Sequence, residues 1–361
     1  MKSLLFLLFI VSIAVGAGAV LLDAIAPQLG LRFPQEESLP REGGLYIFAQ
    51  GSQDWARATV DGGDVKNLLV HDMAFVPQVD GSVILLAGLD GVYQSSDRGL
   101  RWTKVFKETF KGRVEAFVVD TRTPAPAIYA SGLSENGESV VVKSPDGGAT
   151  FQQILTAGPA SKRVVGLALD RFSREKIYAL TSDGIFLVSN DSGRSWSSEQ
   201  IGGGSFVKLL MHPSDPSMLF ALTRAGTFYK STNSGATWRN MEPVLTVNTT
   251  APARVYSVAF ASSGGTLYVG TDQGLLRSRN SGESFERIEL LLASQRVVTA
   301  VAVDPQRSGT IYVGAGQQLL RTTDEGATWQ VSSGAIGAGW IGSLTVHPLD
   351  SDLVYIGILS S

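Results

Sequence analysis

The sequence predicts an all-β protein, a single seven-bladed β-propeller of four-stranded antiparallel blades, preceded by one N-terminal transmembrane or signal helix. Three observations support this prediction. An eight-residue motif recurs six times at intervals of 42 to 49 residues, which is a spacing typical of propellers and other repeat folds. Short apolar runs separated by Gly, Asp, Asn and Ser fill each interval. A run of 19 uncharged residues stands near the N-terminus.

Residues 4–22 form the uncharged run, with Lys2 before it and Asp23 after it. As a helix that rises about 1.5 Å per residue, the run matches a hydrocarbon core of ~30 Å. The positive charge on its N-terminal side predicts that the rest of the chain lies outside the cytoplasm. The alternative is a signal peptide cleaved near 17–19, although the apolar region of such peptides usually has only about 7–15 residues.

Both interpretations export the body of the chain. We expect it at the extracytoplasmic (periplasmic or outer) face of the cytoplasmic membrane on a single N-terminal anchor, or secreted after signal cleavage. The sequence therefore divides into three parts: an anchor or signal peptide at 1–22, a Pro-containing tether at 23–43 and the propeller at 44–361.

The repeat unit is clearest between Arg163 and Trp196. The run VVGLAL is followed by a polar turn, then by IYALT, the turn SDG, IFLVS and the motif, and one more strand follows Trp196. Runs of β-branched and aromatic residues bounded by such turns predict strands. Because four short strands make one propeller blade, the chain is predicted to contain six complete blades.

The two ends of the propeller predict a seventh blade. Residues 341–359 contain the first two strands of a blade, and 44–60 resemble the last two, with GSQDW as a decayed copy of the motif. Each half alone would leave strand edges unpaired. We therefore expect 354–358 to pair with the stretch around Tyr46 and to close the ring.

The recurring motif, called the box below, has the form S/T-x-D/N-x-G-x-x-W/F and is expected in the turn between the third and fourth strands. The Asp or Asn oxygen can accept hydrogen bonds from turn N–H groups, and the leading hydroxyl can cap the same turn. The Gly permits a positive φ, and the aromatic ring is expected to bury its area against the neighbouring sheet. The predicted structural residues are Asp97, Gly99, Trp102, Asp146, Gly148, Phe151, Asp191, Gly193, Trp196, Asn233, Gly235, Trp238, Asn280, Gly282, Phe285, Asp324, Gly326 and Trp329.

A calcium site is the alternative interpretation of the boxes. Calcium takes about 6–8 oxygen ligands, whereas each box has one carboxylate at the key position, and Asn233 and Asn280 replace it in two boxes. We therefore assign the boxes to the fold and expect no metal. The chain has no Cys, which excludes thiolate sites, disulfides and a lipid-modified cysteine. Its three His residues are not clustered, so we expect no cofactor.

The charge distribution gives no indication of nucleic-acid binding. The chain has 30 Lys and Arg residues against 33 Asp and Glu residues, a net charge of −3. No basic surplus or block of like charge is present. We therefore expect no nucleic-acid partner.

The box resembles the Asp-box, or bacterial neuraminidase repeat, and the match covers residues from about 44 to 359. The Asp-box occurs in sialidases, xyloglucan-degrading glycoside hydrolases, sortilin-type receptors and the photosystem II stability/assembly factor family, so the resemblance implies a propeller but no single function. The assembly factor family implies seven blades and a basic patch on the propeller. Its bacterial members often have a lipid-anchoring Cys, which this chain lacks.

Catalysis has weak support in the sequence. A sialidase would need three arginines, an Asp acid/base and a Tyr–Glu pair, and its family usually has an Arg-Ile-Pro motif before the boxes. The nearest approach is LRFPQ at 31–35, which lacks the Ile. A glycosidase needs two carboxylates at a set separation, and no such pair stands out, so no catalytic residue is assigned. An exported glycoside hydrolase or glycan-binding protein of the sialidase or xyloglucanase type remains the alternative.

A second pattern suggests a binding site. Each of four arginines stands immediately before a Val that opens the first strand of a blade: Arg113, Arg163, Arg254 and Arg296. Because first strands line the central channel, these residues should gather at one mouth, on the face away from the boxes, and attract an acidic loop or a carboxylate. The alternative is four unrelated solvated side chains. Blades 1, 4 and 7 lack the arginine: His71 is nearby in the first, Ser205 aligns in the fourth and Trp340 aligns in the seventh.

These observations predict a non-enzymatic, membrane-tethered propeller that binds protein. We expect it to act as an assembly factor or accessory subunit, with a membrane protein complex or another exported protein as its partner.

Overall fold

A computed structural model gives the fold of most of the propeller. It describes residues 44–49, 55–60, 63–64, 72–78, 81–88, 91–105, 109–110, 113–122, 125–246, 252–262, 264–290, 297–331 and 339–360. The predicted anchor at 1–22, the tether at 23–43 and Arg296 lie outside these residues. Within the described ranges, no helix combines the length and the hydropathy needed to cross a bilayer.

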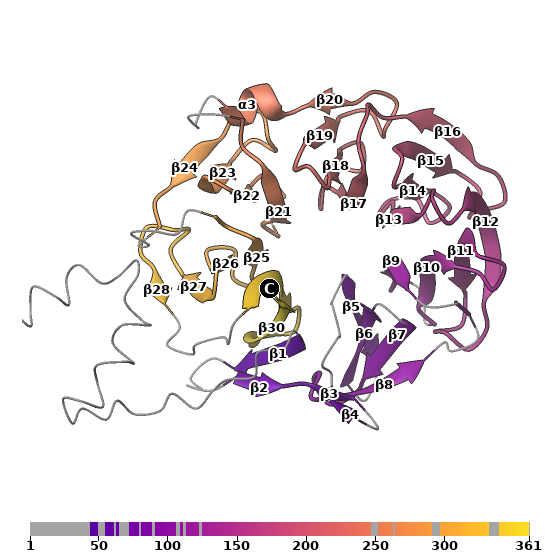
Figure 1. The fold of residues 1–361 in the computed structure, drawn as a ribbon, viewed down its shortest axis with the longest axis horizontal. Coiled ribbons are helices and arrows are strands. Elements are labelled where there is room, and N and C mark those ends of the chain that lie inside the picture. The colour runs from indigo at the N-terminus through magenta and orange to yellow at the C-terminus, as the bar shows by residue number, and fades with distance from the viewer. Residues whose placement is uncertain are drawn as a thin grey trace, which may run out of the picture. The chain divides into compact units, whose positions relative to one another are not determined.

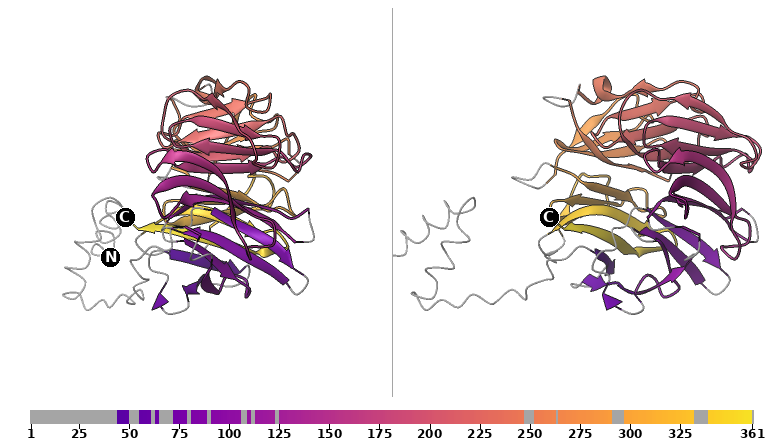
Figure 2. Two further views of the ribbon diagram at one scale, coloured as in Figure 1. Left: turned by 90° about the vertical axis from the view of Figure 1, so that its right-hand side faces the viewer. Right: turned by 45° about the vertical axis from the view of Figure 1, so that its right-hand side comes forward.

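Seven sheets are arranged in a ring around a central axis (Figure 1). Blades 1 to 3 comprise β5 (Asp72–Gln78), β6 (Gly81–Gly88), β7 (Gly91–Ser95) and β8 (Arg101–Val105); β9 (Val114–Asp120), β10 (Ala127–Leu133), β11 (Glu138–Ser144) and β12 (Gln152–Pro159); and β13 (Val164–Leu169), β14 (Ile177–Thr181), β15 (Ile185–Ser189) and β16 (Ser197–Gln200). Within each blade the strands are antiparallel and follow chain order. They run between the two faces of the ring (Figure 2).

Blades 4 to 6 repeat this order. They comprise β17 (Phe206–Met211), β18 (Leu219–Thr223), β19 (Phe228–Ser231) and β20 (Arg239–Asn240); β21 (Val255–Phe260), β22 (Leu267–Thr271), β23 (Gly274–Ser278) and β24 (Glu286–Ile288); and β25 (Ala300–Val303), β26 (Ile311–Ala315), β27 (Gln318–Thr322) and β28 (Gln330–Val331). The second strands β14, β18, β22 and β26 are buried along their whole length. Their continuous apolar sequences suit a strand that is covered on both faces.

Blade 7 is built from both ends of the propeller, as predicted. It contains β29 (Gly339–His347), β30 (Asp350–Ser360), β1 (Gly44–Ala49) and β2 (Trp55–Arg57). β1 and β30 are antiparallel, with Tyr46 opposite Ile356 and Gly44 opposite Ile358. No covalent bond joins these two strands, so hydrogen bonds and packing close the ring.

Two elements differ from the prediction of plain four-stranded blades. β3 (Thr59–Val60) and β4 (Gly63–Asp64) add to the outer edge of blade 1, where β3 lies parallel to β8. The short helix α3 (Glu242–Thr246) follows blade 4, and the side chain of Asn240 accepts the N–H of Glu242 at its start. Such a side-chain cap satisfies an N–H group that has no partner within the helix.

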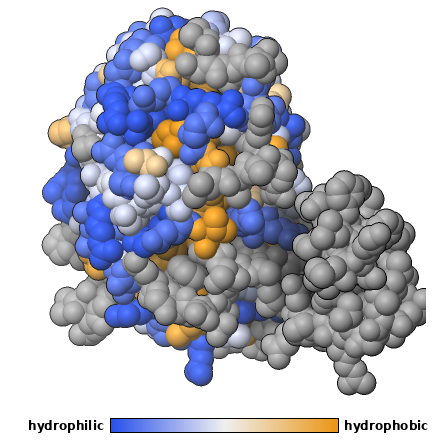
Figure 3. All heavy atoms as spheres, turned by 90° about the vertical axis from the view of Figure 1, so that its left-hand side faces the viewer, coloured by the Kyte–Doolittle hydropathy of each residue, from blue (hydrophilic) through white to orange (hydrophobic). Residues whose placement is uncertain are grey.

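The hydrophobic core lies between the blades. Among the described residues, seven buried clusters each join two neighbouring sheets, one at every seam of the ring. At the seam between blades 3 and 4, for example, Tyr178 and Phe186 pack with Phe206. The outer strands are polar by contrast, and β16 is exposed along its whole length. The side of the ring that carries β24 and β28 is accordingly mostly hydrophilic, with narrow hydrophobic stretches (Figure 3).

The boxes form the turns between third and fourth strands. In the blade 3 box, Asp191 Oδ1 accepts the N–H of Ser195 at 2.9 Å, and Ser189 Oγ accepts the N–H of Gly193 at 2.7 Å. Gly193 has a φ of 92°, and the preceding Ser192 has a φ of 62°. Five boxes place a non-Gly residue at this preceding position with a positive φ: Arg98, Ser192, Ser234, Ser281 and Glu325.

The Asn boxes keep the same geometry with a different donor. Asn233 Oδ1 accepts the N–H of Thr237 at 2.9 Å, and its amide Nδ2 donates to Thr237 Oγ1 at 2.8 Å. In the Asp191 box, the second carboxylate oxygen instead accepts the hydroxyl of Ser195 at 2.6 Å. These hydrogen bonds lower the pKa of Asp191 to about 2, the hydroxyl of Ser195 contributing most.

Three seams place a donor against the carbonyl of a positive-φ box residue in the next blade. Lys230 Nζ donates to Ser281 O at 2.7 Å, across the seam between blades 4 and 5. Arg277 Nη1 donates to Glu325 O at 2.9 Å, across the next seam. At the closing seam, the Tyr355 hydroxyl donates to Arg98 O at 3.0 Å. The same backbone position is thus the acceptor at all three seams.

The two histidines that follow inner strands cap the next turn. His212 Nδ1 accepts the N–H groups of Ser214 and Asp215 at 3.3 and 3.0 Å. Asp170 occupies the equivalent position in blade 3, where its Oδ1 accepts the N–H groups of Phe172 and Ser173. His347 accepts the N–H of Leu349 in the same way, so at these positions a neutral imidazole replaces a carboxylate.

Candidate functional site

The face of the ring opposite the boxes carries the predicted arginines. Every inner strand begins on this face, and the turn between the second and third strands returns to it, because neighbouring strands are antiparallel. Arg113 precedes β9, Arg163 precedes β13 and Arg254 precedes β21. The fourth predicted residue, Arg296, lies outside the described residues.

Arg113 and Arg163 meet on one carboxylate. Arg113 Nε lies 3.0 Å from one oxygen of Glu115, and Arg163 Nη1 lies 3.4 Å from the other. The side chain of Glu115 is 5% exposed, whereas the side chains of Arg113 and Arg163 are about one-third exposed, at 33% and 32%. The buried carboxylate therefore pairs with two partly exposed cations and orients both of them.

Arg224 completes the group, which we call the arginine pocket: Arg113, Glu115, Arg163 and Arg224. These residues line a cavity of about 240 Å³, together with Val165, Phe206 and Val207. Arg224 lies in the turn between β18 and β19 and is exposed. Blade 4, which has Ser205 where blades 2, 3, 5 and 6 have an arginine, thus supplies its arginine from a different turn.

The arginine pocket carries more positive than negative charge. Its three arginines face one glutamate, which leaves two positive charges in excess. Burial lowers the pKa of Arg113, Glu115 opposes that effect, and Arg163 and Arg224 lower the pKa further by repulsion. An incoming carboxylate would relieve this repulsion, and guanidinium groups bind carboxylates in paired hydrogen bonds.

Arg254 extends the pocket toward blade 5. Its Nη2 donates to Arg224 O at 3.0 Å, and its guanidinium lies 5.2 Å from the centre of the Tyr256 ring. Tyr256 is 37% exposed and Trp340, near the start of β29, is 47% exposed. Arg, Tyr and Trp are the residue types enriched at the centres of protein interfaces.

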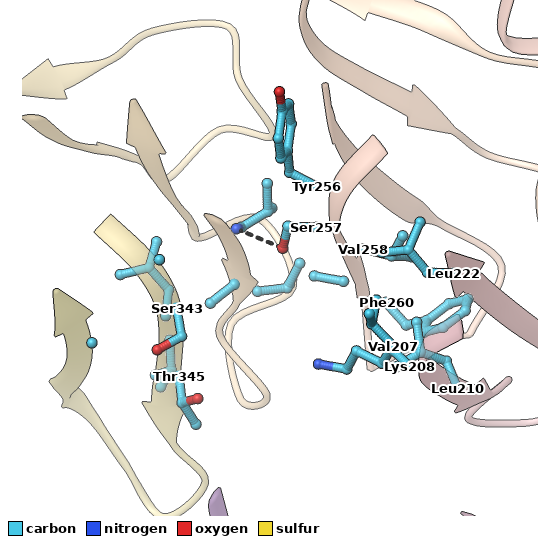
Figure 4. Close-up of a pocket in the computed structure, with 18 of the residues that line it drawn as sticks. Val207, Lys208, Leu210, Leu222, Tyr256, Ser257, Val258, Phe260, Ser343 and Thr345 are labelled. Carbon is cyan, nitrogen blue, oxygen red and sulfur yellow. Dashed lines mark hydrogen bonds between the residues drawn. The ribbon is translucent and has the colours of Figure 1, made fainter. Parts of the chain in front are cut away.

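A second, larger cavity occupies the central channel beside blades 4 to 7, and we call it the channel cavity. It has a volume of about 570 Å³ and lies between β17, β21, β25 and β29 (Figure 4). Aliphatic residues predominate in its lining, which also has the hydroxyl-bearing side chains Tyr256, Ser257, Ser343 and Thr345. Lys208 extends its ammonium group into the space (Figure 4). Of the residues that line the arginine pocket and the channel cavity, only Val207 belongs to both.

Sequence reasoning missed Glu115 and Arg224. Glu115 stands two residues after Arg113, at a position where the equivalent residue of blade 3 is Val165. The sequence signal for Glu115 was a charged residue at an inner-strand position where blade 3 has an apolar one. Arg224 lies in the TRAG turn, and the rule that this turn shares a face with the strand starts would have located it.

The described residues contain no group of three or more His, Asp or Glu side chains placed to hold a metal ion. The site therefore consists of cations, one buried carboxylate and exposed aromatic rings. Side chains of these kinds can bind an anion.

A sequence-family model described as "Sortilin, neurotensin receptor 3" matches residues 139–246. This part of the chain runs from the third strand of blade 2 to α3. No curated protein sequence matched the chain.

Solved propeller structures are similar in fold. The GH74 xyloglucanase from Xanthomonas campestris has a TM-score of 0.61 at 18% identity, over 81% of this chain and 51% of that one. This chain therefore spans about half the length of the xyloglucanase. YCF48 from Cyanidioschyzon merolae has a TM-score of 0.61 at 16% identity, over 81% of this chain and 96% of that one. A structure of YCF48 bound to D1 peptide has a TM-score of 0.59 at 18% identity, over 81% and 93% of the two chains. At these identities the likeness shows the fold alone.

Proposed function

We propose that this chain is a non-enzymatic, protein-binding propeller that acts as an assembly factor or accessory subunit of a membrane protein complex. Residues 1–22 would tether it, through 23–43, to the extracytoplasmic face of a membrane. The observation that carries the proposal is the arginine pocket, in which three guanidinium groups surround one buried glutamate. The partner would present an acidic segment to this face.

The arrangement of the pocket supports binding of an acidic partner. Glu115 fixes Arg113 and Arg163, so less side-chain freedom is lost when they bind a ligand. Arg224 and Arg254 are exposed beside them and extend the positive region. Tyr256 and Trp340 add apolar contact area on the same face. This combination of oriented cations and exposed aromatic rings suits a protein surface.

The fold comparison adds support at a coarser level. YCF48 is matched over almost its whole length, and one of its structures holds a D1 peptide. A single propeller of this size can therefore bind a peptide. We take from this only the class of ligand, since identity is below 20%.

The second candidate is an exported glycoside hydrolase or glycan-binding protein, favoured by the likeness to the xyloglucanase. A glycosidase needs two carboxyl groups roughly 5–10 Å apart. Among the described residues that line the two cavities, Glu115 is the one carboxylate, and two arginines pair with it. This lining favours binding over hydrolysis.

The test is a pulldown of the full-length chain from detergent-solubilised native membranes. The variant Arg224→Glu/Arg254→Glu reverses two exposed charges on the arginine face and leaves the Glu115 pairs intact. The control, Arg171→Glu/Arg194→Glu, makes the same change in net charge at exposed positions on the box face. We expect a stoichiometric membrane protein to co-purify with the wild type and the control, and to fall at least about tenfold with the first variant.

Two results would overturn the proposal. Equal recovery of the partner by both variants would remove the arginine face as its binding site. Absence of any stoichiometric protein, together with hydrolysis of a polysaccharide by the purified chain, would favour the glycosidase.

A further inference from the structure

The channel cavity has the properties of a ligand site separate from the arginine pocket. Small-molecule sites usually enclose about 300–1,000 Å³ and are mainly apolar with a few polar groups. The channel cavity, at about 570 Å³, lies within this range. We propose that it binds a small amphipathic anion, namely an aliphatic chain that ends in a carboxylate.

The lining supplies the apolar part of this site. Apolar residues of blades 4 to 7 line the space, and those that are partly exposed include Val207 of β17, Val258 and Phe260 of β21 and Leu344 of β29. Burial of an alkyl chain against such a surface is favoured by the removal of apolar area from water. The space follows the inner strands from Tyr256 to Phe260, which suits an extended chain better than a compact ligand.

Lys208 supplies the polar part. It is the one charged residue among the described residues that line the cavity. Its side chain is exposed, and no ion pair within the described ranges involves its ammonium group. The nitrogen projects into the cavity rather than along the wall (Figure 4). A single cation in an apolar space is complementary to a ligand with one negative charge and an apolar body.

Other ligand classes fit this lining less well. A sugar carries a hydroxyl group on most of its carbons, and a hydroxyl buried without a hydrogen-bond partner is destabilising. The lining offers one ammonium group and few hydroxyls, and Ser257 Oγ already accepts the N–H of Val301 at 3.1 Å. A dianion would leave one charge unpaired, since Lys208 is the only cation among the described residues of the lining.

Calorimetry with octanoate and its uncharged analogue octanamide tests the proposal. The full-length chain is kept in solution with an amphipol. The variant Ser343→Phe fills the cavity from β29 and serves as the blank, because it measures how much ligand the amphipol itself takes up. We expect saturable octanoate binding by the wild type and none by the blank. Lys208→Met should weaken octanoate binding about tenfold and leave octanamide binding unchanged. Lys162→Met, at a lysine outside the cavity, is the matched control and should bind both ligands as the wild type does.

Three outcomes would overturn the proposal. The first is the absence of saturable octanoate binding. The second is equal octanoate affinity in the wild type and Lys208→Met. The third is loss of octanoate binding in Arg224→Glu/Arg254→Glu, which would assign the carboxylate to the arginine pocket. The test is independent of the protein-binding proposal, because each proposal has its own variant.

Discussion

The seam between blades 4 and 5 and the closing seam between blades 7 and 1 solve the same problem with different donors. Each presents the carbonyl of a positive-φ box residue, Ser281 in one and Arg98 in the other. Lys230, whose side chain is 2% exposed, reaches the first carbonyl, and the Tyr355 hydroxyl reaches the second. The difference teaches that the acceptor, the carbonyl of the box residue with a positive φ, is the same at both seams. The donor is whichever polar side chain of the preceding blade can reach that carbonyl.

Blade 7 explains the change of donor. In blades 4 and 5 the cation stands immediately before the box, on the third strand. The third strand of blade 7 is β1, which ends in a decayed box, and the corresponding acceptor is reached instead from the second strand, β30. The closing seam thus uses a neutral hydrogen bond where the seam between blades 4 and 5 uses a buried cation.

The largest expected effect follows from Lys230→Met. This change leaves Ser281 O without its donor and removes the pair with Glu283, whose pKa Lys230 lowers by hydrogen bonding. Hydrogen bonds that involve a charged group contribute about 1.5–3 kcal/mol, so we expect a loss of about 2 kcal/mol in the free energy of unfolding, measured in urea. Lys143 holds the same place in blade 2 and also lies over a ring, that of Tyr129, as Lys230 lies over Phe220. Among the described residues, however, only Lys230 of the two donates to a box carbonyl. Lys143→Met should therefore cost much less, and equal losses would contradict a special role for the Lys230 seam.

Tyr355→Phe tests the closing seam with a smaller expected effect. It removes the hydroxyl that donates to Arg98 O and keeps the buried ring. One neutral hydrogen bond contributes about 1 kcal/mol, and we expect a loss of that size in urea unfolding. The matched control is Tyr178→Phe in blade 3, since the hydroxyl of Tyr178 is buried without a hydrogen-bond partner. Tyr178→Phe should be as stable as the wild type or more stable. If it loses as much free energy of unfolding as Tyr355→Phe, the hydrogen bond at the closing seam does not explain the loss.

A histidine at each seam predicts a shared sensitivity to acid. Burial lowers the pKa of His212 and of His347 below the usual 6.5. His212 lies beside Ser281 at one seam, and His347 packs edge-on against Phe75 of blade 1 at the other. Between the folded pKa and 6.5 the unfolded chain binds more protons, so stability is full above pH 6.5 and falls as the pH drops through the folded value.

Urea unfolding at pH 7.5 and pH 5.5 measures this effect, which we expect to be smaller than that of Tyr355→Phe. His212→Asn keeps an acceptor for the turn and removes the titration, so it should reduce the difference between the two pH values. An unchanged difference in this variant would show that His212 does not contribute to it.

The smallest effect is expected from the boxes themselves. Asp191→Asn should leave the melting temperature at pH 7 unchanged, because Asn233 and Asn280 make equivalent bonds in their own boxes. The pKa of Asp191 is lowered to about 2, so the wild-type box loses stability only as the pH falls from about 3.8 toward 2. A lower melting temperature of Asp191→Asn than of the wild type at pH 7 would mean that the charge of Asp191, and not only its acceptor oxygen, stabilises the box.

The sequence was sufficient to predict the seven blades and their closure, because the box spacing and the two half-blades are local patterns. It could not predict the β3–β4 addition to blade 1, since strands of two residues leave no periodic pattern. α3 was missed for a similar reason, as one helical turn is too short to show periodicity. The strands of the blades can be predicted because their sequence pattern repeats. The short elements β3, β4 and α3 depend on tertiary contacts, which the sequence pattern does not show.

The candidate site was predicted only in outline. The strand-start rule located Arg113, Arg163 and Arg254, but the rule treats each blade alone. Glu115 and Arg224 matter because the ring brings blades 2, 3 and 4 together. Lys208 was missed as well, since a charge on an inner strand gains significance only when the apolar walls around it are known.

The pairing of β1 with β30 has a consequence for synthesis. β1, the first strand of the ring to leave the ribosome, pairs with β30, which is made after the strands of blades 1 to 6. Contacts between such distant segments slow folding, because a long loop must close before they form. Blades 1 to 6 must therefore persist with an open end until β30 has been made, and any factor that shields β1 during that interval would govern how much closed ring is produced.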